Sequence, residues 1–153
     1  MWESQWIHYM FNCSLYVLVG VPTPQPAVKA LIEYDGQYLL LKHVVSDQHL
    51  WTLPGGKVEF DESPTEAVRR EVDEEVSLTV DVGSPVGIYD FQFDNVHIVA
   101  TVITCSVLSE PPCVDTTANP ADETIFNHEW VTKKSGVSDR PMNDGLAQVL
   151  ASL

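Results

Sequence analysis

The chain has 153 residues, 44% of them hydrophobic, which is enough for one domain with a hydrophobic core. Its 8 basic and 22 acidic residues give a formal net charge of −14, which excludes nucleic acids and anionic membranes as partners bound through bulk charge. No stretch reaches the roughly 18 apolar residues that a membrane-spanning helix requires.

The acidic residues are spread along the chain rather than gathered in a tail, so the composition does not predict a disordered acidic segment. Many acids with few lysines are also typical of proteins from salt-accumulating organisms, in which dissolved ions screen the self-repulsion. A local cluster of acids can therefore be plain solvated surface. The three cysteines, Cys13, Cys105 and Cys113, have no metal-like spacing and predict no disulfide framework, which agrees with a reducing compartment.

Residues 1–22 begin with the apolar run MWESQWIHYMFNCSLYVLVG, which lacks a basic leader and a small-residue cleavage site. We therefore do not interpret it as a signal peptide, and the cytoplasm is the default location. We expect an extension that adds a strand or a helix to the domain, or that offers an interface for a homodimer. Residues 23–153 form the predicted domain.

The first predicted elements surround a hairpin. Residues 22–28 read PTPQPAV, which is typical of a linker or of a segment that leads into the fold. Residues 28–44 contain two apolar runs on either side of Asp35-Gly36, a strong signal for a β-hairpin. A short strand is expected at residues 50–54 (LWTLP), followed by a tight turn in the sequence PGGK.

A helix is predicted to begin after Ser63, where the sequence SPTE places Pro64 at the first helical position and Glu66 two residues later, as in a capping box. Valines at i+4 spacing form its buried stripe: Val68, Val72 and Val76. The pattern ends near Val76 or Ser77.

Four more strands are predicted at residues 78–82, 86–93, 96–107 and 126–131. An irregular acidic connection runs from Pro111 to about Glu123, and a helix is expected within residues 142–153. Several strands with one central and one terminal helix predict an α/β domain with a mixed sheet.

The predicted helix carries an unusually dense run of acids, RREVDEEV, over residues 69–76. Because a helix advances about 100° per residue, Glu71, Glu74 and Glu75 share one narrow face, beside the buried valines. Asp73 and Glu66 point away, toward solvent. Carboxylate oxygens suit Mg²⁺ or Mn²⁺, but this geometry alone leaves a metal site and a solvated acidic surface equally open.

Arg70 has an ordinary explanation on the same helix. Its position allows an i,i+4 salt bridge to Glu74 or to Glu66.

The residues before the helix favour the metal site. Gly55 and Gly56 stand in a loop where glycine lets the backbone approach a ligand closely. Five residues separate Gly56 from Glu62, and seven separate Glu62 from the pair Arg70-Glu71. This segment, GKVEFDESPTEAVRREVDEEVSL, resembles the Nudix box, and the chain resembles a MutT-like Nudix hydrolase.

The resemblance implies the Nudix fold, an α/β/α sandwich with a mixed central sheet. One position departs from the box, because Ser77 stands where the family has a glycine at the end of the helix. If Ser77 adopts a positive φ there, the cost is roughly 1 kcal/mol. This departure concerns the end of the helix rather than the chemistry.

The resemblance also implies Mg²⁺-dependent (or Mn²⁺-dependent) hydrolysis of the pyrophosphate linkage in a nucleoside diphosphate derivative, by attack of water on phosphorus. It implies metal binding by Glu71, Glu74 and Glu75, with a backbone carbonyl from Gly55 or Gly56. Arg70 would orient these glutamates.

Either Glu71 or Glu74 would act as the general base. Glu123 and Glu129 are candidates for this role outside the box, although a surface position is the simpler explanation for both.

The sequence also offers candidates for substrate contacts: Gly55, Glu59, Tyr89 and Phe91. Glu59 and Glu62 either help the metal site, or brace the loop, or are acids favoured by the helix dipole.

Tyr89, Phe91 and Phe93 alternate along one strand face and could recognise a base, but core packing is the favoured explanation. Trp51 and Trp130 have the same two explanations. Four histidines lack ligand spacing and are interpreted as structural or exposed: His43, His49, His97 and His128.

Two substrate classes remain open, nucleoside triphosphates and ADP-ribose-like compounds, whereas the absence of an SQPWP-like run disfavours NADH. A non-catalytic Nudix-fold module that senses a nucleotide is the alternative function. Degenerate glutamates would mark such a module, and the box glutamates are all present, which favours the hydrolase.

Overall fold

The computed structural model describes residues 22–45, 47–93, 95–117, 125–133 and 137–153. Three sequence-based expectations lie outside the described residues: the structure of residues 1–21, the environment of Cys13 and the role of Glu123. The division into an extension and a domain stays a prediction.

The hairpin prediction is confirmed. Strand β1 spans Gln25–Tyr34 and β2 spans Gln37–Val45, and the turn between them has positive φ at Asp35 (48°) and Gly36 (73°). Of the two alternatives for residues 22–28, the linker is wrong from Gln25 onward, where β1 begins. Although Pro26 has no N–H, its carbonyl accepts a hydrogen bond from Val58 N (3.0 Å), so it fits into the ladder.

The other strands follow the predictions with shifted ends. Strand β3 spans Gln48–Thr52, two residues earlier than expected, and β6 spans Ile125–Thr132. Strand β5 spans Val96–Val107 as predicted. The two strands expected over residues 78–93 form one long strand, β4 (Val80–Phe93), and the register shifts on both sides of Pro85.

All six strands form one mixed sheet in the order β3-β2-β1-β5-β4, with β6 paired to β2. Strands β1 and β5 are parallel, and the other pairs are antiparallel. The registered pairs of β1 with β2 are only Glu33↔Tyr38 and Tyr34↔Gln37; farther along, β2 pairs with β3. The two strands therefore diverge, and the loop after β3 takes the vacated edge of β1.

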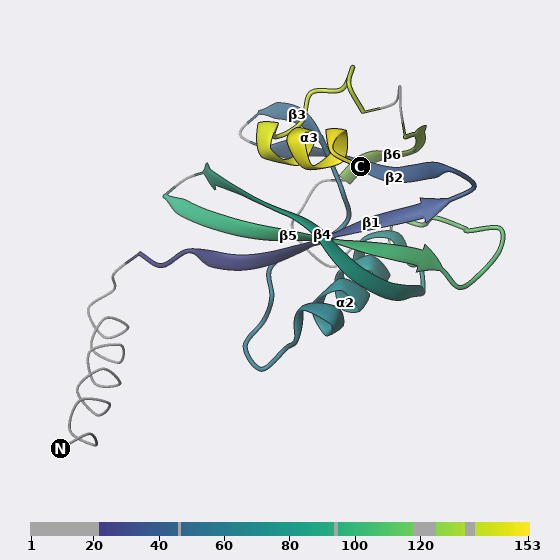
Figure 1. The fold of residues 1–153 in the computed structure, drawn as a ribbon, viewed down its shortest axis with the longest axis horizontal. Helices are drawn as coiled ribbons and strands as arrows, with labels where there is room; N and C mark the ends of the chain where they lie inside the picture. Colours follow the sequence, from purple (N-terminus) through teal and green to yellow (C-terminus); the bar gives the residue numbers. More distant parts are fainter. Residues whose placement is uncertain (1–21, 46, 94, 118–124, 134–136) are drawn as a thin grey trace.

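Two helices cover opposite faces of this sheet (Figure 1). Helix α2 (Pro64–Val76) packs through its valines on one face, and α3 (Asp144–Ala151) packs through Leu146 and Leu150 on the other. The predicted C-terminal helix is therefore confirmed but shorter, because the Asn143 side chain caps its start. This arrangement is the expected α/β/α sandwich.

No helix among the described residues is long and apolar enough to cross a membrane.

Both ends of α2 lie where the sequence predicted them. Ser63 Oγ accepts a hydrogen bond from Glu66 N (3.3 Å), and Ser63 N donates to Glu66 Oε2 (2.8 Å), which completes the capping box. At the other end, Ser77 lies in the left-handed region (φ 53°, ψ 35°) and its N–H donates to Asp73 O (3.0 Å). The helix therefore ends with glycine-like geometry on a serine.

We predict that Ser77→Gly stabilises the protein by about 0.5–1 kcal/mol, because glycine removes the strain of Cβ at positive φ. Ser77→Ala is the matched control, since it keeps Cβ and removes only the hydroxyl. Urea unfolding monitored by circular dichroism measures the difference. A Ser77→Gly variant no more stable than Ser77→Ala would contradict the prediction.

Candidate active site

The loop between β3 and α2 lies flat against β1. Val28 N donates to Gly56 O (2.9 Å) and Ala30 N donates to Pro54 O (2.8 Å). Gly55 has φ +133°, and a Cβ there would lie 2.3 Å from Val28 O. A Cβ on Gly56 would lie 2.6 Å from Glu71 Oε1. The first glycine thus lets the loop approach β1, and the second lets a carboxylate of α2 approach the loop.

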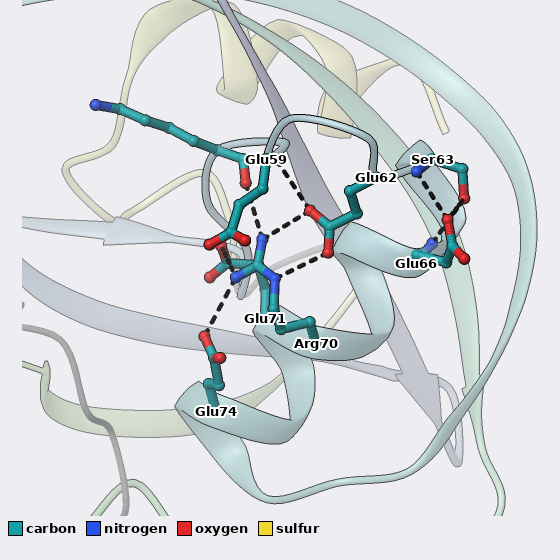
Figure 2. Close-up of polar contacts among 8 residues, drawn as sticks. Glu59, Glu62, Ser63, Glu66, Arg70, Glu71 and Glu74 are labelled. Atoms are coloured by element: carbon teal, nitrogen blue, oxygen red, sulfur yellow. Dashed lines mark hydrogen bonds and ion pairs between the residues drawn. The ribbon is translucent and has the colours of Figure 1, made fainter.

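The Arg70 guanidinium joins α2 to this loop (Figure 2). Two of its nitrogens bond the Glu62 carboxylate, Nε to Oε1 (2.9 Å) and Nη2 to Oε2 (3.0 Å), and Nη2 also donates to Lys57 O (3.0 Å). Nη1 donates to Glu71 (2.8 Å) and to Glu74 (3.2 Å). One cation therefore binds three carboxylates and offsets part of their mutual repulsion, which lets Glu71 and Glu74 stand close together.

The network of Arg70 shifts the pKa values of its members. The hydrogen bonds from Arg70 hold the pKa of Glu62 below its usual value, and the same contacts raise the pKa of Arg70.

The expected salt bridge between Arg70 and Glu74 is confirmed, but the alternative partner, Glu66, is wrong. Its carboxylate is taken by the Ser63 cap.

Glu71 is the more enclosed of the two acids that share Nη1. Its side chain is 14% exposed, against 37% for Glu74. Burial raises the pKa of Glu71, and the hydrogen bond and charge of Arg70 and the charge of Lys29 oppose this rise.

Glu75 is buried between α2 and the sheet. Its side chain is 3% exposed, its Oε2 accepts a hydrogen bond from Gly55 N (2.6 Å), and its Oε1 lies 3.9 Å from His43 Nε2. The position of His43 beside the box was not among the predictions from the sequence. The available signal was its alternation with Leu39 and Leu41, which places it on the face of β2 that α2 covers.

Helix geometry predicted that the three box glutamates share one face. In the structure, their carboxylates do not converge on one point. Glu71 and Glu75 reach the glycine loop, whereas Glu74 and one Glu71 oxygen are turned to Arg70. Within the described residues, no three His, Cys, Asp or Glu side chains form a group arranged to hold a metal ion. The donors are nevertheless all oxygens within one short loop and one helix, which suits a hard cation once Glu71 and Glu74 rotate away from Arg70.

Lys29 makes a contact with the glycine loop that was not predicted from the sequence. Its Nζ donates a hydrogen bond to Gly55 O, across 26 residues of sequence. Nothing in the spacing of the box points to β1, so only the packing of the loop on this strand reveals the lysine.

Of the remaining acids, Glu62 braces the loop, as one of the predicted alternatives had it, because its Oε2 also accepts from Glu59 N (3.0 Å). The Glu59 residue itself is exposed. Glu129 is turned toward Arg140, whose Nη2 lies 2.6 Å from its Oε1.

The aromatic candidates lie mainly in the core. Tyr89 is 7% exposed and stacks on Phe91, with ring centroids 5.9 Å apart, against the α3 face of the sheet. Trp51 belongs to the same cluster, with Lys42 Nζ and Arg140 Cζ within 5.9 Å and 5.2 Å of its ring centroid. Trp130 packs edge-on against Tyr34. Core packing, the favoured explanation, agrees with these contacts, and the side chain of Phe93 lies outside the described residues.

Comparison with known proteins identifies the family. The model of the NUDIX domain matches residues 23–153. This chain belongs to the NUDIX family. Over 121 residues it is 31% identical to ADP-ribose pyrophosphatase of Methanocaldococcus jannaschii, and the match covers 72% of each chain. Over 58 residues it is 48% identical to CTP pyrophosphohydrolase of Escherichia coli, covering 37% of this chain and 43% of that one.

Solved structures agree with the NUDIX assignment. The crystal structure of the MutT protein from Methanosarcina mazei matches with a TM-score of 0.72 and 26% identity, over 87% of this chain and 95% of that chain. The chain spans less than half the length of two of the curated relatives that it matches (46% and 43%).

We predict that Gly56→Ala moves the Glu71 carboxylate but leaves the fold intact, because the clashing atoms belong to the end of a flexible side chain. Gly55→Ala is the matched comparison, since its Cβ would strike the backbone of β1 at a φ that disfavours alanine. We expect a loss of roughly 2 kcal/mol or more in unfolding free energy for Gly55→Ala and less than half of that for Gly56→Ala. Equal losses in thermal or denaturant unfolding would contradict this account.

We predict that Arg70→Gln lowers the unfolding free energy by roughly 1–3 kcal/mol, because it leaves three carboxylates facing one another without their cation. Its neighbour Arg69 is exposed, and Arg69→Gln is the control for the loss of one positive charge. Denaturant titrations at pH 7 measure both variants. A loss in Arg69→Gln as large as that in Arg70→Gln would assign the effect to net charge instead of to the network.

Proposed function

We propose that this NUDIX protein hydrolyses the pyrophosphate linkage of a nucleoside diphosphate derivative with the help of Mg²⁺ or Mn²⁺. The observation that carries the proposal is the pairing of Glu71 and Glu75 with the Gly55–Gly56 loop, beside the network of Arg70. In a chain with a net charge of −14, a pyrophosphate needs such a local cation site to bind at all.

The residues that would hold the metal are Glu71, Glu74 and Glu75, with a backbone carbonyl at Gly55 or Gly56. A divalent cation bound there would neutralise phosphate oxygens and lower the pKa of a water molecule. Glu75 keeps its hydrogen bond to Gly55 N and fixes the loop, so it holds its place rather than moving a proton. Glu71 or Glu74 is left to accept the proton of the attacking water.

In the proposed reaction, water forms a bond to phosphorus and the bridging P–O bond breaks. The proton of the water passes to the glutamate base, and the bridging oxygen leaves with the departing phosphate group. In the metal-free protein, Arg70 holds Glu71 and Glu74 close together and orients them, because a single nitrogen donates to both carboxylates. The cation offsets the repulsion between these two like charges until a metal ion takes over that role.

Two substrate classes are supported by relatives. One relative is named for ADP-ribose and another for CTP, and we propose that this chain acts on a compound of one of these two classes. Tyr89 and Phe91 lie largely within the core, so we do not assign them to base recognition. Glu59, an exposed residue in the loop next to Arg70, remains the proposed substrate contact from the sequence (Figure 2).

We predict that Glu74→Gln lowers Mg²⁺-dependent hydrolysis of the best substrate by roughly 100-fold or more, because glutamine can neither accept a proton nor add negative charge to the metal site. Asp73→Asn is the matched control, since this neighbouring acid is exposed and lies off the box face. A panel of nucleoside triphosphates, ADP-ribose and dinucleotides, assayed for released phosphate groups, measures the effect. Tight binding of a nucleotide without turnover in Mg²⁺ would instead support a non-catalytic sensor.

A further inference from the structure

Lys29 places a positive charge beside the box from a strand that carries none of the box residues. It is one of only 8 basic residues, and it stands in the middle of β1, paired in register with Val102 of β5. It is half-buried, and its ammonium donates to Gly55 O. A lysine that is partly removed from water in a sheet centre requires such a partner.

The oxygen that Lys29 contacts belongs to the proposed metal site. Gly55 O is one of the two alternative backbone carbonyls proposed as a metal ligand, and the next residue, Gly56, lies directly against the Glu71 carboxylate.

Lys29 and Arg70 place positive charges at this loop from two separate elements. Arg70 binds Glu71 at 2.8 Å from within α2, and Lys29 binds Gly55 O from β1. Both are protein cations at a place where the proposed function requires a divalent cation. Positive charges that share one oxygen repel each other, so a metal ion on Gly55 O and the Lys29 ammonium cannot both be held there favourably.

We propose that Lys29 is a positioning residue that holds Gly55 O, and with it the glycine loop, in the metal-free protein and gives up this contact when a divalent cation binds. The inference rests on the proposed function, because it concerns the same metal site. Lys29 then has two opposite effects: it stabilises the metal-free loop, and it competes with the metal ion for one of its ligands.

Two variants separate the charge from the hydrogen bond. Lys29→Met removes both, whereas Lys29→Gln keeps an amide donor without the positive charge. Lys29→Arg retains the cation. Lys133→Met is the matched control, because Lys133 pairs with Glu33 (2.7 Å) near the other end of β1. Isothermal titration with Mg²⁺ and thermal unfolding in EDTA report on the two effects without any assay of activity.

We expect Lys29→Met and Lys29→Gln to bind Mg²⁺ roughly tenfold more tightly than the wild-type protein, because a competing unit charge is gone. Lys29→Arg and Lys133→Met should bind Mg²⁺ as the wild type does. In EDTA, Lys29→Met should melt at a lower temperature than Lys29→Gln. Should Lys29→Met fail to fold, Lys29→Gln still carries the test of affinity.

An unchanged or weaker Mg²⁺ affinity in Lys29→Gln, with the wild type still binding the ion, would overturn this inference and leave the proposed function standing. A wild-type protein that neither binds Mg²⁺ nor hydrolyses any nucleotide would overturn both. The kinetic constants give a second distinction, since competition at Gly55 O predicts a shift in the Mg²⁺ concentration for half-maximal rate.

Discussion

The site depends on the backbone hydrogen bonds that hold residues 54–58 against β1. They are possible only because β1 and β2 diverge after two registered pairs and leave an edge of β1 open. Gly55 fits there because it has no Cβ to strike Val28 O. Once the loop is fixed, its N–H and carbonyl groups face Glu75 and Lys29, and α2 starts in the right place to bring Glu71 beside Gly56. The separation of two strands thus creates the framework of the site.

Helix α2 is a compromise between stability and function. Its capping box and valine stripe favour the helix, while four acids within residues 71–75 oppose it. Arg70 relieves the repulsion by binding three carboxylates at once, one of them from the preceding loop. The helix ends on a serine with positive φ, which adds a small cost where no functional group is involved. Under the proposed function, the acidic face supplies oxygens to the metal site at a cost in helix stability.

Local signals in the sequence were enough for much of the fold. The Asp35-Gly36 turn, the SPTE cap and the long apolar run over residues 96–107 each determine an element through nearby residues, and all three were predicted correctly. The merging of two strands into β4 was missed, because pairing with β5 overrides the local break around Pro85. The start of β1 was missed for the same reason, since Pro26 gains a partner only when the loop arrives.

The candidate site was predictable only where its residues are close in sequence. Spacing within the box brought out Glu71, Glu74, Glu75 and Arg70, but helix geometry alone could not show that two of these acids turn toward Arg70. Lys29 is 26 residues from Gly55 in the sequence, and His43 contacts Glu75 from another strand, so their approach to the site depends on how the strands pack.

The two register shifts in β4 cancel in their effect on which face of the sheet each side chain occupies. Between Val82 and Gly87, β4 uses two more residues than β5, so the alternation of faces is the same before and after the irregularity. Val82 therefore faces α2 while Tyr89 and Phe91 still face α3. Losing one residue here would turn both rings to the wrong side of the sheet, whereas losing two would restore them. Among homologues that keep the fold, insertions and deletions in this segment should accordingly come in steps of two residues.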